Sequence, residues 1–307
     1  MLKQRVITAL ILVGILLPTL WADALWPFAI LSLVFVAAGG WEWGRLNGVA
    51  GTGAWMLGAA VALGCLGLAQ VWGLPVWDAL PHDHSASIGH EHGADHALVG
   101  FMVPALAWWL AAAVWLAGLV VALRWGAGRW RHWPTPLRAA LGWAVLLMAW
   151  LALTEAKLQG LNLLLSMLCL VWAADIGAYF GGRAFGRRKL APAISPGKSW
   201  EGVVAGAVAT QALAWAWVGI DQSWGVDAPS LYSHLRFGLG DVGLVLAVLA
   251  LTGVSVAGDL FESLIKREAG AKDSSQLLPG HGGVLDRIDA LLPVLPVAMA
   301  LMALCHG

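Results

Sequence analysis

Long apolar runs recur along the whole chain, and they restrict its fold more than any other feature. Each run approaches the roughly 20 residues that a helix needs to cross a bilayer. Only 12% of the 307 residues are charged and 60% are hydrophobic, whereas soluble domains carry about 25% charged residues. The runs also lack the alternation of barrel strands, so they predict transmembrane helices. The expected fold class is an all-α, polytopic integral membrane protein.

Nine membrane spans can be drawn, and Asp23 and Pro27 mark a tight hairpin between the first two. The first run follows a basic start and is similar to a signal peptide, but it lacks a convincing cleavage site, so we expect an uncleaved span. The chain divides into an N-terminal transmembrane region, 1–156, and a C-terminal region, 157–307, with polar loops at 181–201 and 259–289. The spans are about 6–22, 24–41, 54–74, 98–123, 137–155, 160–180, 202–220, 238–258 and 290–305.

The distribution of Lys and Arg predicts the orientation of these spans. With the N-terminus inside, only Lys157 and Arg236 of the 18 basic residues fall in outer segments. Lys and Arg concentrate in cytoplasmic loops. We therefore expect a cytoplasmic N-terminus, an extracytoplasmic C-terminus, and both polar loops on the cytoplasmic face. Near the outer face, Glu155 is expected to pair with Lys157.

Other features exclude some function classes. The formal net charge is zero, so no basic field favours a nucleic-acid partner. The cysteines lie far apart without a CxxC pair, which argues against a disulfide framework. The outer loop contains five histidines within 82–96. These could bind Zn²⁺ or Cu²⁺, but a solvated, mobile loop is the favoured interpretation.

The strongest motif is GDLFESLIKREAGAKDSSQLLPGHGGVLDRIDALLP, from Gly258 to Pro293. If its start is helical, Asp259, Ser263 and Lys266 lie on one face. An acid, a hydroxyl and a base on one stripe at the exit from the membrane suit a metal-bound phosphate.

Further along this motif, a glycine-rich turn and two carboxylates strengthen the hypothesis of a phosphate site. Gly280, Gly282 and Gly283 permit backbone conformations whose N–H groups cradle an anion. Asp286 and Asp289 enter the last span, where they could hold Mg²⁺. Each residue alone fits an ordinary charged loop, but the complete set favours a site.

A second motif runs from Ala173 to Gly202 and includes SPGKSWEG. Asp175 lies near the inner end of an apolar span, where ionisable groups are functional by default. The arginines that follow it fit a plain positive-inside anchor equally well. Ser195, Lys198 and Ser199 offer hydroxyls, a cation and backbone N–H groups to a polyphosphate, although the spacing is not that of a P-loop.

These two motifs, roughly from Trp172 to Pro293, resemble the bacterial phosphatidate cytidylyltransferase (CDP-diacylglycerol synthase) family. Ser199 stands where the family more often has Thr, and the His-rich loop is not part of its pattern. The C-terminal signature is nearly complete, with Ser263, Lys266, Arg267, Lys272, Asp273, Pro279, His281, Gly282, Gly283, Asp286, Arg287 and Asp289 at its spacing.

The resemblance implies that CTP and phosphatidate react to CDP-diacylglycerol and pyrophosphate with Mg²⁺, in a bacterial inner membrane. It implies that Asp259, Lys266 and Asp286 are catalytic, and that the metal is held by Asp259 and Asp286, with Asp289 as a further ligand. A homodimer is left open. The expected substrate-binding residues are Ser195, Lys198, Ser199, Ser263, Arg267, Lys272, Asp273, His281, Gly282, Gly283 and Arg287.

The chemistry agrees with this inventory, because the attacking phosphate is already ionised and charge neutralisation is the main requirement. We expect the two polar loops to converge on one site, with Lys198 serving the phosphates. Two alternatives stay open. The first is a CTP-dependent enzyme acting on another lipid phosphate or an isoprenoid alcohol. The second is an ion-coupled transporter, which is disfavoured because no internal repeat is visible.

Overall fold

The computed structural model describes residues 2–77, 102–125 and 127–305, and these residues are mostly helical. Within them, eight helices are long and apolar enough to cross a membrane, and a further apolar stretch, Ala105–Val120, is shorter. This confirms the predicted all-α, multi-pass architecture. The His-rich segment 82–96 lies outside the described residues.

The elements follow the predicted spans in order, and local chemistry sets several boundaries. Pro27 opens α2 in the first helical turn, where a missing N–H costs nothing. Ser199 Oγ accepts a hydrogen bond from Gly202 N (3.2 Å) at the start of α7. The elements are α1 (Leu2–Trp21), α2 (Trp26–Leu46), α3 (Thr52–Val71), α4 (Ala105–Trp125), η1 (Ala127–His132), α5 (Thr135–Gln159), α6 (Leu161–Phe185), β1 (Lys189–Ala191), β2 (Ser195–Ser199), α7 (Trp200–Ser223), α8 (Leu231–Glu268), α9 (Leu285–Ile288) and α10 (Leu291–Cys305).

The two predicted polar loops contain more regular structure than the sequence suggested. Helix α8 runs past both ends of the predicted span 238–258, with a kink at Gly240 (φ 71°) that separates a short first segment from a long second one. The long segment continues to Glu268, so the start of the predicted loop 259–289 is helical. In the other loop, β1 and β2 pair as an antiparallel hairpin.

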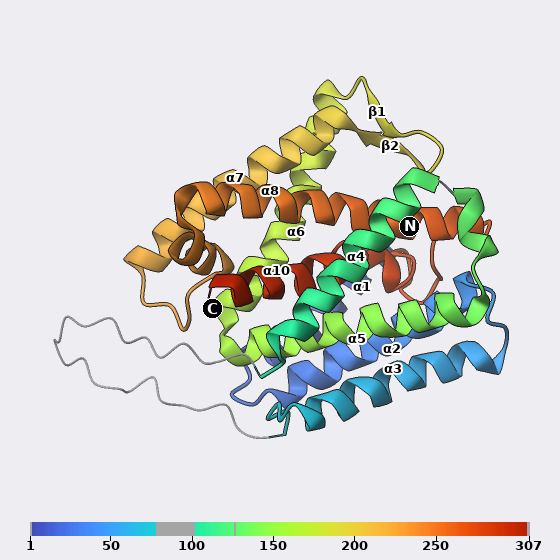
Figure 1. Ribbon diagram of the computed structural model, residues 1–307, viewed down its shortest axis with the longest axis horizontal. Coiled ribbons are helices and arrows are strands. Elements are labelled where there is room, and N and C mark those ends of the chain that lie inside the picture. Colours follow the sequence, from blue (N-terminus) through green and yellow to red (C-terminus); the bar gives the residue numbers. More distant parts are fainter. Residues whose placement is uncertain (1, 78–101, 126, 306–307) are drawn as a thin grey trace.

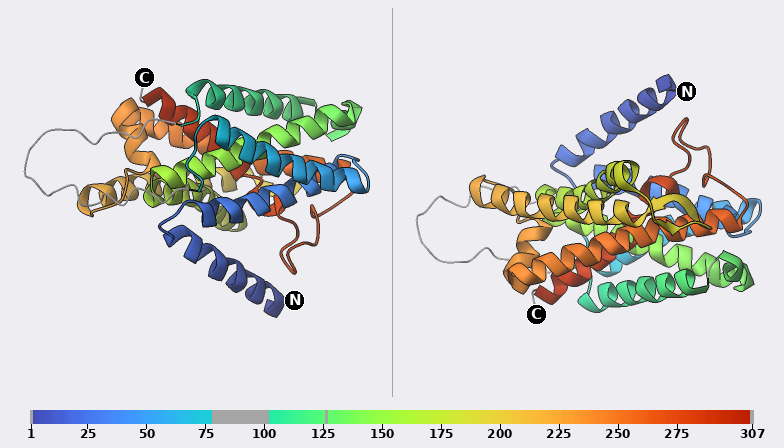
Figure 2. Two further views of the ribbon diagram at one scale, coloured as in Figure 1. Left: turned by 90° about the horizontal axis from the view of Figure 1, so that it is seen from below. Right: turned by 90° about the horizontal axis from the view of Figure 1, so that it is seen from above.

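Helix α10 lies at the centre of the bundle and packs against α4, α5, α6 and α8 (Figure 1). Helices α2, α3 and α5 pack together on one side, whereas α6 and α7 pack with α8 on the other. Helix α1 splays away from the bundle (Figure 2), and most of its described side chains are exposed. In a membrane, such a helix faces apolar neighbours on most sides.

The segments predicted to be cytoplasmic gather at one end of the bundle. The hairpin, η1, the α2–α3 turn and the end of α8 lie at this end, and the C-terminus lies at the other (Figure 1). Arg131 Nε lies 3.8 Å from Glu268 Oε2, which joins η1 to α8. Arg267 Nε donates to Ile194 O (3.3 Å), which joins α8 to the hairpin. The side of the membrane that this end faces stays a prediction.

Candidate active site

A close approach of α8 and α10 brings two of the predicted carboxylates together. A Cβ atom on Gly258 would lie 2.6 Å from Pro293 Cγ and 2.8 Å from Asp289 O, so only glycine permits this packing. As a result, Asp259 on α8 and Asp289 before α10 lie close enough for their charges to repel each other. Asp175 on α6 also interacts with the charge of Asp259.

Lys198 connects the hairpin to this carboxylate group. Its Nζ lies 2.6 Å from Asp259 Oδ2 and donates to Val256 O at 3.4 Å. The Lys198 charge also acts on Asp175 and Asp289. The predicted convergence of segments 181–201 and 259–289 is therefore confirmed, because Lys198 and Asp259 are separated by 2.6 Å in space and lie on different elements.

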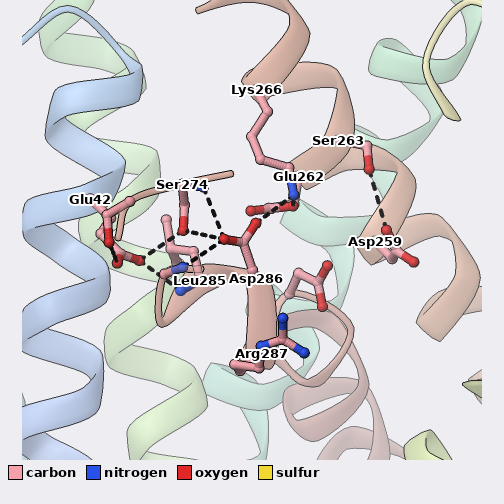
Figure 3. Close-up of polar contacts among 12 residues, drawn as sticks. Glu42, Asp259, Glu262, Ser263, Lys266, Ser274, Leu285, Asp286 and Arg287 are labelled. Carbon is pink, nitrogen blue, oxygen red and sulfur yellow. Dashed lines mark hydrogen bonds and ion pairs between the residues drawn. The ribbon is translucent and has the colours of Figure 1, made fainter. Parts of the chain in front are cut away.

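Lys266, two turns after Asp259 on α8, lies between the carboxylates of Glu262 on the same helix and Asp286 on α9 (Figure 3). Its Nζ lies 2.6 Å from Asp286 Oδ1 and also contacts Glu262 Oε2. Only 12% of the Lys266 side chain and 5% of the Glu262 side chain are exposed. The nearby Ser263 Oγ donates to Asp259 Oδ1 at 3.3 Å, so the helical stripe predicted for Asp259, Ser263 and Lys266 is present. However, Lys266 is paired with carboxylates in this structure.

The glycine-rich turn cradles an anion that belongs to the chain itself. Gly282 adopts a positive φ of 88°, and Gly283 N donates to Asp286 Oδ2 at 2.8 Å. The same oxygen accepts from Ser274 N (2.9 Å) and Ser274 Oγ (3.0 Å). Of the predicted cradle, the Gly283 N–H therefore binds an anion, and that anion is Asp286 in place of a phosphate.

Among the other expected substrate ligands of the C-terminal motif, Arg287 stabilises the surroundings of the site. Arg287 Nε donates to His281 O at 3.2 Å and holds the glycine-rich turn. His281 Nδ1 is buried, with no hydrogen-bond partner among the described residues. Lys272 and Asp273 are exposed in the loop that follows α8.

The expected ligands from the second motif lie on β2. Ser195 pairs with Ala191 of β1. The buried hydroxyl of Ser199 caps α7, so its observed bond is structural.

The sequence interpretation missed four residues near the site and misassigned one pair farther away. Glu42, Glu262, Ser274 and Ser275 are buried around Lys266 and Asp286. Glu42 carried a usable signal, since an ionisable group at the end of an apolar span is functional by default, but the predicted span ended at residue 41. The expected Glu155–Lys157 pair is wrong. Instead, Glu155 accepts from the backbone N–H groups of residues 102 and 103, at 2.8 and 3.3 Å, and Lys157 donates to Leu20 O.

Two of the three predicted metal ligands, Asp259 and Asp289, fit a hard divalent cation, whereas Asp286 is already occupied. Asp259 and Asp289 supply oxygen ligands of the kind that Mg²⁺ prefers, and their mutual repulsion favours a cation between them. The oxygens of Asp286 are already bound by Lys266, Ser274 and Gly283. A cation at Asp286 would have to replace the Lys266 ammonium. Among the described residues, no three acidic, His or Cys side chains form a ready metal cluster.

Comparisons with known sequences show the family of the chain. The chain is 40% identical over 304 residues to a phosphatidate cytidylyltransferase of Pseudomonas aeruginosa, covering 98% of this chain and 97% of that protein. It is 35% identical over 309 residues to the Haemophilus influenzae phosphatidate cytidylyltransferase, covering 96% of each. For the Bacillus subtilis protein of that name, the match is 39% over 145 residues, or 47% of this chain and 49% of that protein. Residues 3–305 also match the cytidylyltransferase family model, so the chain belongs to the cytidylyltransferase family.

Proposed function

We propose that this protein transfers the cytidylyl group of CTP to phosphatidate, forming CDP-diacylglycerol and pyrophosphate. Family membership and two relatives of that name, matched over nearly their full length, support this activity. The observation that carries the proposal is the 2.6 Å contact between Lys198 and Asp259. It joins two polar segments at one end of a membrane bundle, where a bilayer lipid and a soluble nucleotide can meet.

In the reaction, a phosphate oxygen of phosphatidate attacks the α-phosphorus of CTP. A new P–O bond forms, the bond to the β-phosphate breaks, and pyrophosphate leaves with the electron pair. The attacking phosphate is ionised at neutral pH, so no side chain must remove a proton. The barrier comes from bringing two anions together, and positioned cations lower it.

Lys198 and Lys266 are the cations that the chain supplies. Each is held by carboxylates, Lys198 by Asp259 and Lys266 by Asp286 and Glu262. These contacts orient both ammonium groups before substrate arrives. Lys198 also donates to Val256 O, so each lysine has two acceptors in this structure. One of the three Nζ protons of each ammonium is left for a phosphate oxygen, because an ammonium carries three donors.

Mg²⁺ is the proposed cofactor, and Asp259 and Asp289 are the residues best placed to hold it. Asp286 would become a further ligand only by releasing Lys266. When bound, it would neutralise phosphate charge as a Lewis acid. The remaining proposals follow from topology and from the bacterial relatives. They place the protein in the inner membrane with the site facing the cytoplasm, require no nucleic-acid partner, and leave a homodimer open.

The direct test uses the purified protein, Mg²⁺ and liposomes that contain phosphatidate. With CTP labelled at the α-phosphate, the label should enter CDP-diacylglycerol, whereas a γ-label should appear in pyrophosphate. Liposomes with an isoprenoid alcohol in place of phosphatidate test the alternative substrate. Transfer to the alcohol, with no product from phosphatidate, would overturn the proposal.

A further inference from the structure

Glu42 is a buried carboxylate on α2 whose polar contacts all come from the far end of the sequence. The residue is 0% exposed. One oxygen accepts from Ser275 Oγ (2.5 Å) and Val284 N (2.9 Å), and the other from Ser274 Oγ (3.1 Å) and Leu285 N (2.7 Å). Figure 3 shows this carboxylate beside the Lys266–Asp286 pair.

Hydrogen bonds alone stabilise this carboxylate. Among the described residues, no Lys, Arg or His forms an ion pair with Glu42. A buried charge without compensation is expensive, and four donors to one carboxylate provide that compensation. Losing the carboxylate would leave three buried donors, Ser275 Oγ, Val284 N and Leu285 N, without their acceptor.

The four donors lie at the two ends of one loop. Ser274 and Ser275 precede the loop 276–283, and Val284 and Leu285 follow it. Glu42 thus ties both ends of the glycine-rich turn to α2. Leu285 is also the first residue of α9, which carries Asp286, so the contact fixes where Asp286 enters the site.

A shared hydroxyl links Glu42 directly to Asp286. Ser274 Oγ lies 3.1 Å from Glu42 Oε2 and 3.0 Å from Asp286 Oδ2. A hydroxyl carries one proton, so Ser274 donates to one carboxylate at a time, and a change at Glu42 alters the hydrogen bonding of Asp286. Asp286 in turn holds Lys266 at 2.6 Å.

The contact between Glu42 and Ser274 also restricts which residue can stand at position 283. A Cβ atom there would lie 2.0 Å from Ser274 Oγ and 2.4 Å from Glu42 Oε1. Any other residue would displace the Ser274 hydroxyl or the Glu42 carboxylate from its present position. One glycine of the GHGG motif is therefore needed for the approach of Glu42, independently of any phosphate.

We propose that Glu42 is a positioning residue that sets the place of Asp286, and through it Lys266, by tying both ends of the loop 276–283 to α2. This inference rests on the proposed cytidylyl transfer, because it assigns Asp286 and Lys266 to that reaction. Glu42 itself does not touch the substrates.

The test compares Glu42→Gln with Glu155→Gln in the full-length protein. The two wild-type residues are a matched pair, since Glu155 is 1% exposed and also accepts from two backbone N–H groups, but on another helix. In Glu42→Gln, an amide NH₂ faces hydrogen-bond donors. We expect kcat to fall about 10–100-fold, as for other residues that orient a ligand, and KM for CTP to rise. A lower folded fraction would reduce kcat without moving KM.

Three further measurements make the test specific. Glu42→Asp keeps the charge and should recover part of the activity. Ser274→Ala should cost less in the Glu42→Gln background than alone, because the two residues act as one unit. Hydrogen–deuterium exchange at 274–286 should accelerate in Glu42→Gln but not in Glu155→Gln.

Equal kinetics for Glu42→Gln and Glu155→Gln, or unchanged exchange at 274–286, would overturn the positioning role. Failure of the wild type to make CDP-diacylglycerol would instead overturn the proposed function. The exchange comparison would then still report whether Glu42 orders the loop.

Discussion

Replacing Lys266 by methionine should cost both stability and catalysis, and the two losses can be separated. The Lys266 Nζ contacts Glu262 and lies 2.6 Å from Asp286, and the three side chains are 12%, 5% and 8% exposed. Breaking a buried ion pair by removing one partner costs about 3–5 kcal/mol, because the remaining charge loses its compensation. We therefore expect a clearly lower melting temperature and a loss of turnover of about 10²–10³-fold.

A double variant, Lys266→Met with Glu262→Gln, removes the cation together with its most buried carboxylate. Asp286 keeps its hydrogen bonds from Ser274 and Gly283. Most of the lost stability should return, since replacing both charges of a buried pair is often nearly neutral. Turnover should not return, because the ammonium is still missing.

The assay is thermal unfolding in detergent, followed by Trp fluorescence, together with CDP-diacylglycerol formation at a temperature where every variant is folded. Arg236→Met is the matched control. Its partner Asp241 lies 2.7 Å away, but the two side chains are 35% and 63% exposed. Exposed pairs contribute at most about 1 kcal/mol. The reasoning fails if Lys266→Met is as stable as this control, or if the double variant regains turnover.

Three other changes test the site and the topology. Asp286→Asn keeps an acceptor for Ser274 and Gly283 but removes one charge paired with Lys266, so turnover should fall at least about 100-fold. The melting temperature should fall less than in Lys266→Met, because Lys266 keeps its contact with Glu262; near-normal activity contradicts a catalytic role. Replacing residues 82–96 by a Gly/Ser linker of equal length should leave catalysis intact, and a large loss of activity, or a loss reversed by Zn²⁺, would assign a function to the histidines. A reporter that is active only in the cytoplasm should be silent when fused after Gly307, whereas activity there would contradict the nine-span count.

Features with a local physical cause could be predicted from the sequence. Membrane helices were predictable because burial in a bilayer requires continuous apolar runs. The hairpin marked by Asp23 and Pro27 does lie between α1 and α2, since the fixed φ and missing N–H of Pro27 suit a first helical turn. The convergence of the two polar segments could also be predicted, because charge neutralisation required cations from both, although the pairing of Lys198 with Asp259 was not foreseen.

Features that depend on distant partners could not be predicted. Glu42 accepts hydrogen bonds from donors more than 230 positions away, such as Ser274 Oγ. No residue near Glu42 in the sequence indicates these contacts. The N–H groups of the glycine-rich turn fit any anion, so the motif alone could not distinguish Asp286 from a phosphate. The end of the span at residue 258 was misplaced because α8 continues beyond the apolar run as a partly buried polar helix.

The most direct test of cytidylyl transfer at the junction of the two polar segments is a double-mutant cycle on Lys198 and Asp259. The quantity measured is the rate of CDP-diacylglycerol formation from CTP and phosphatidate in liposomes, for the wild type, Lys198→Ala, Asp259→Asn and the double variant. We expect each single variant to lose most activity and Lys198→Arg to recover part of it, since Arg keeps the charge but changes the geometry. The double variant should lose less than the product of the two single losses, because groups 2.6 Å apart are coupled. An unchanged rate in Lys198→Ala, or losses that simply multiply in the double variant, would contradict a shared site. Segment 181–201 would then be a membrane anchor alone.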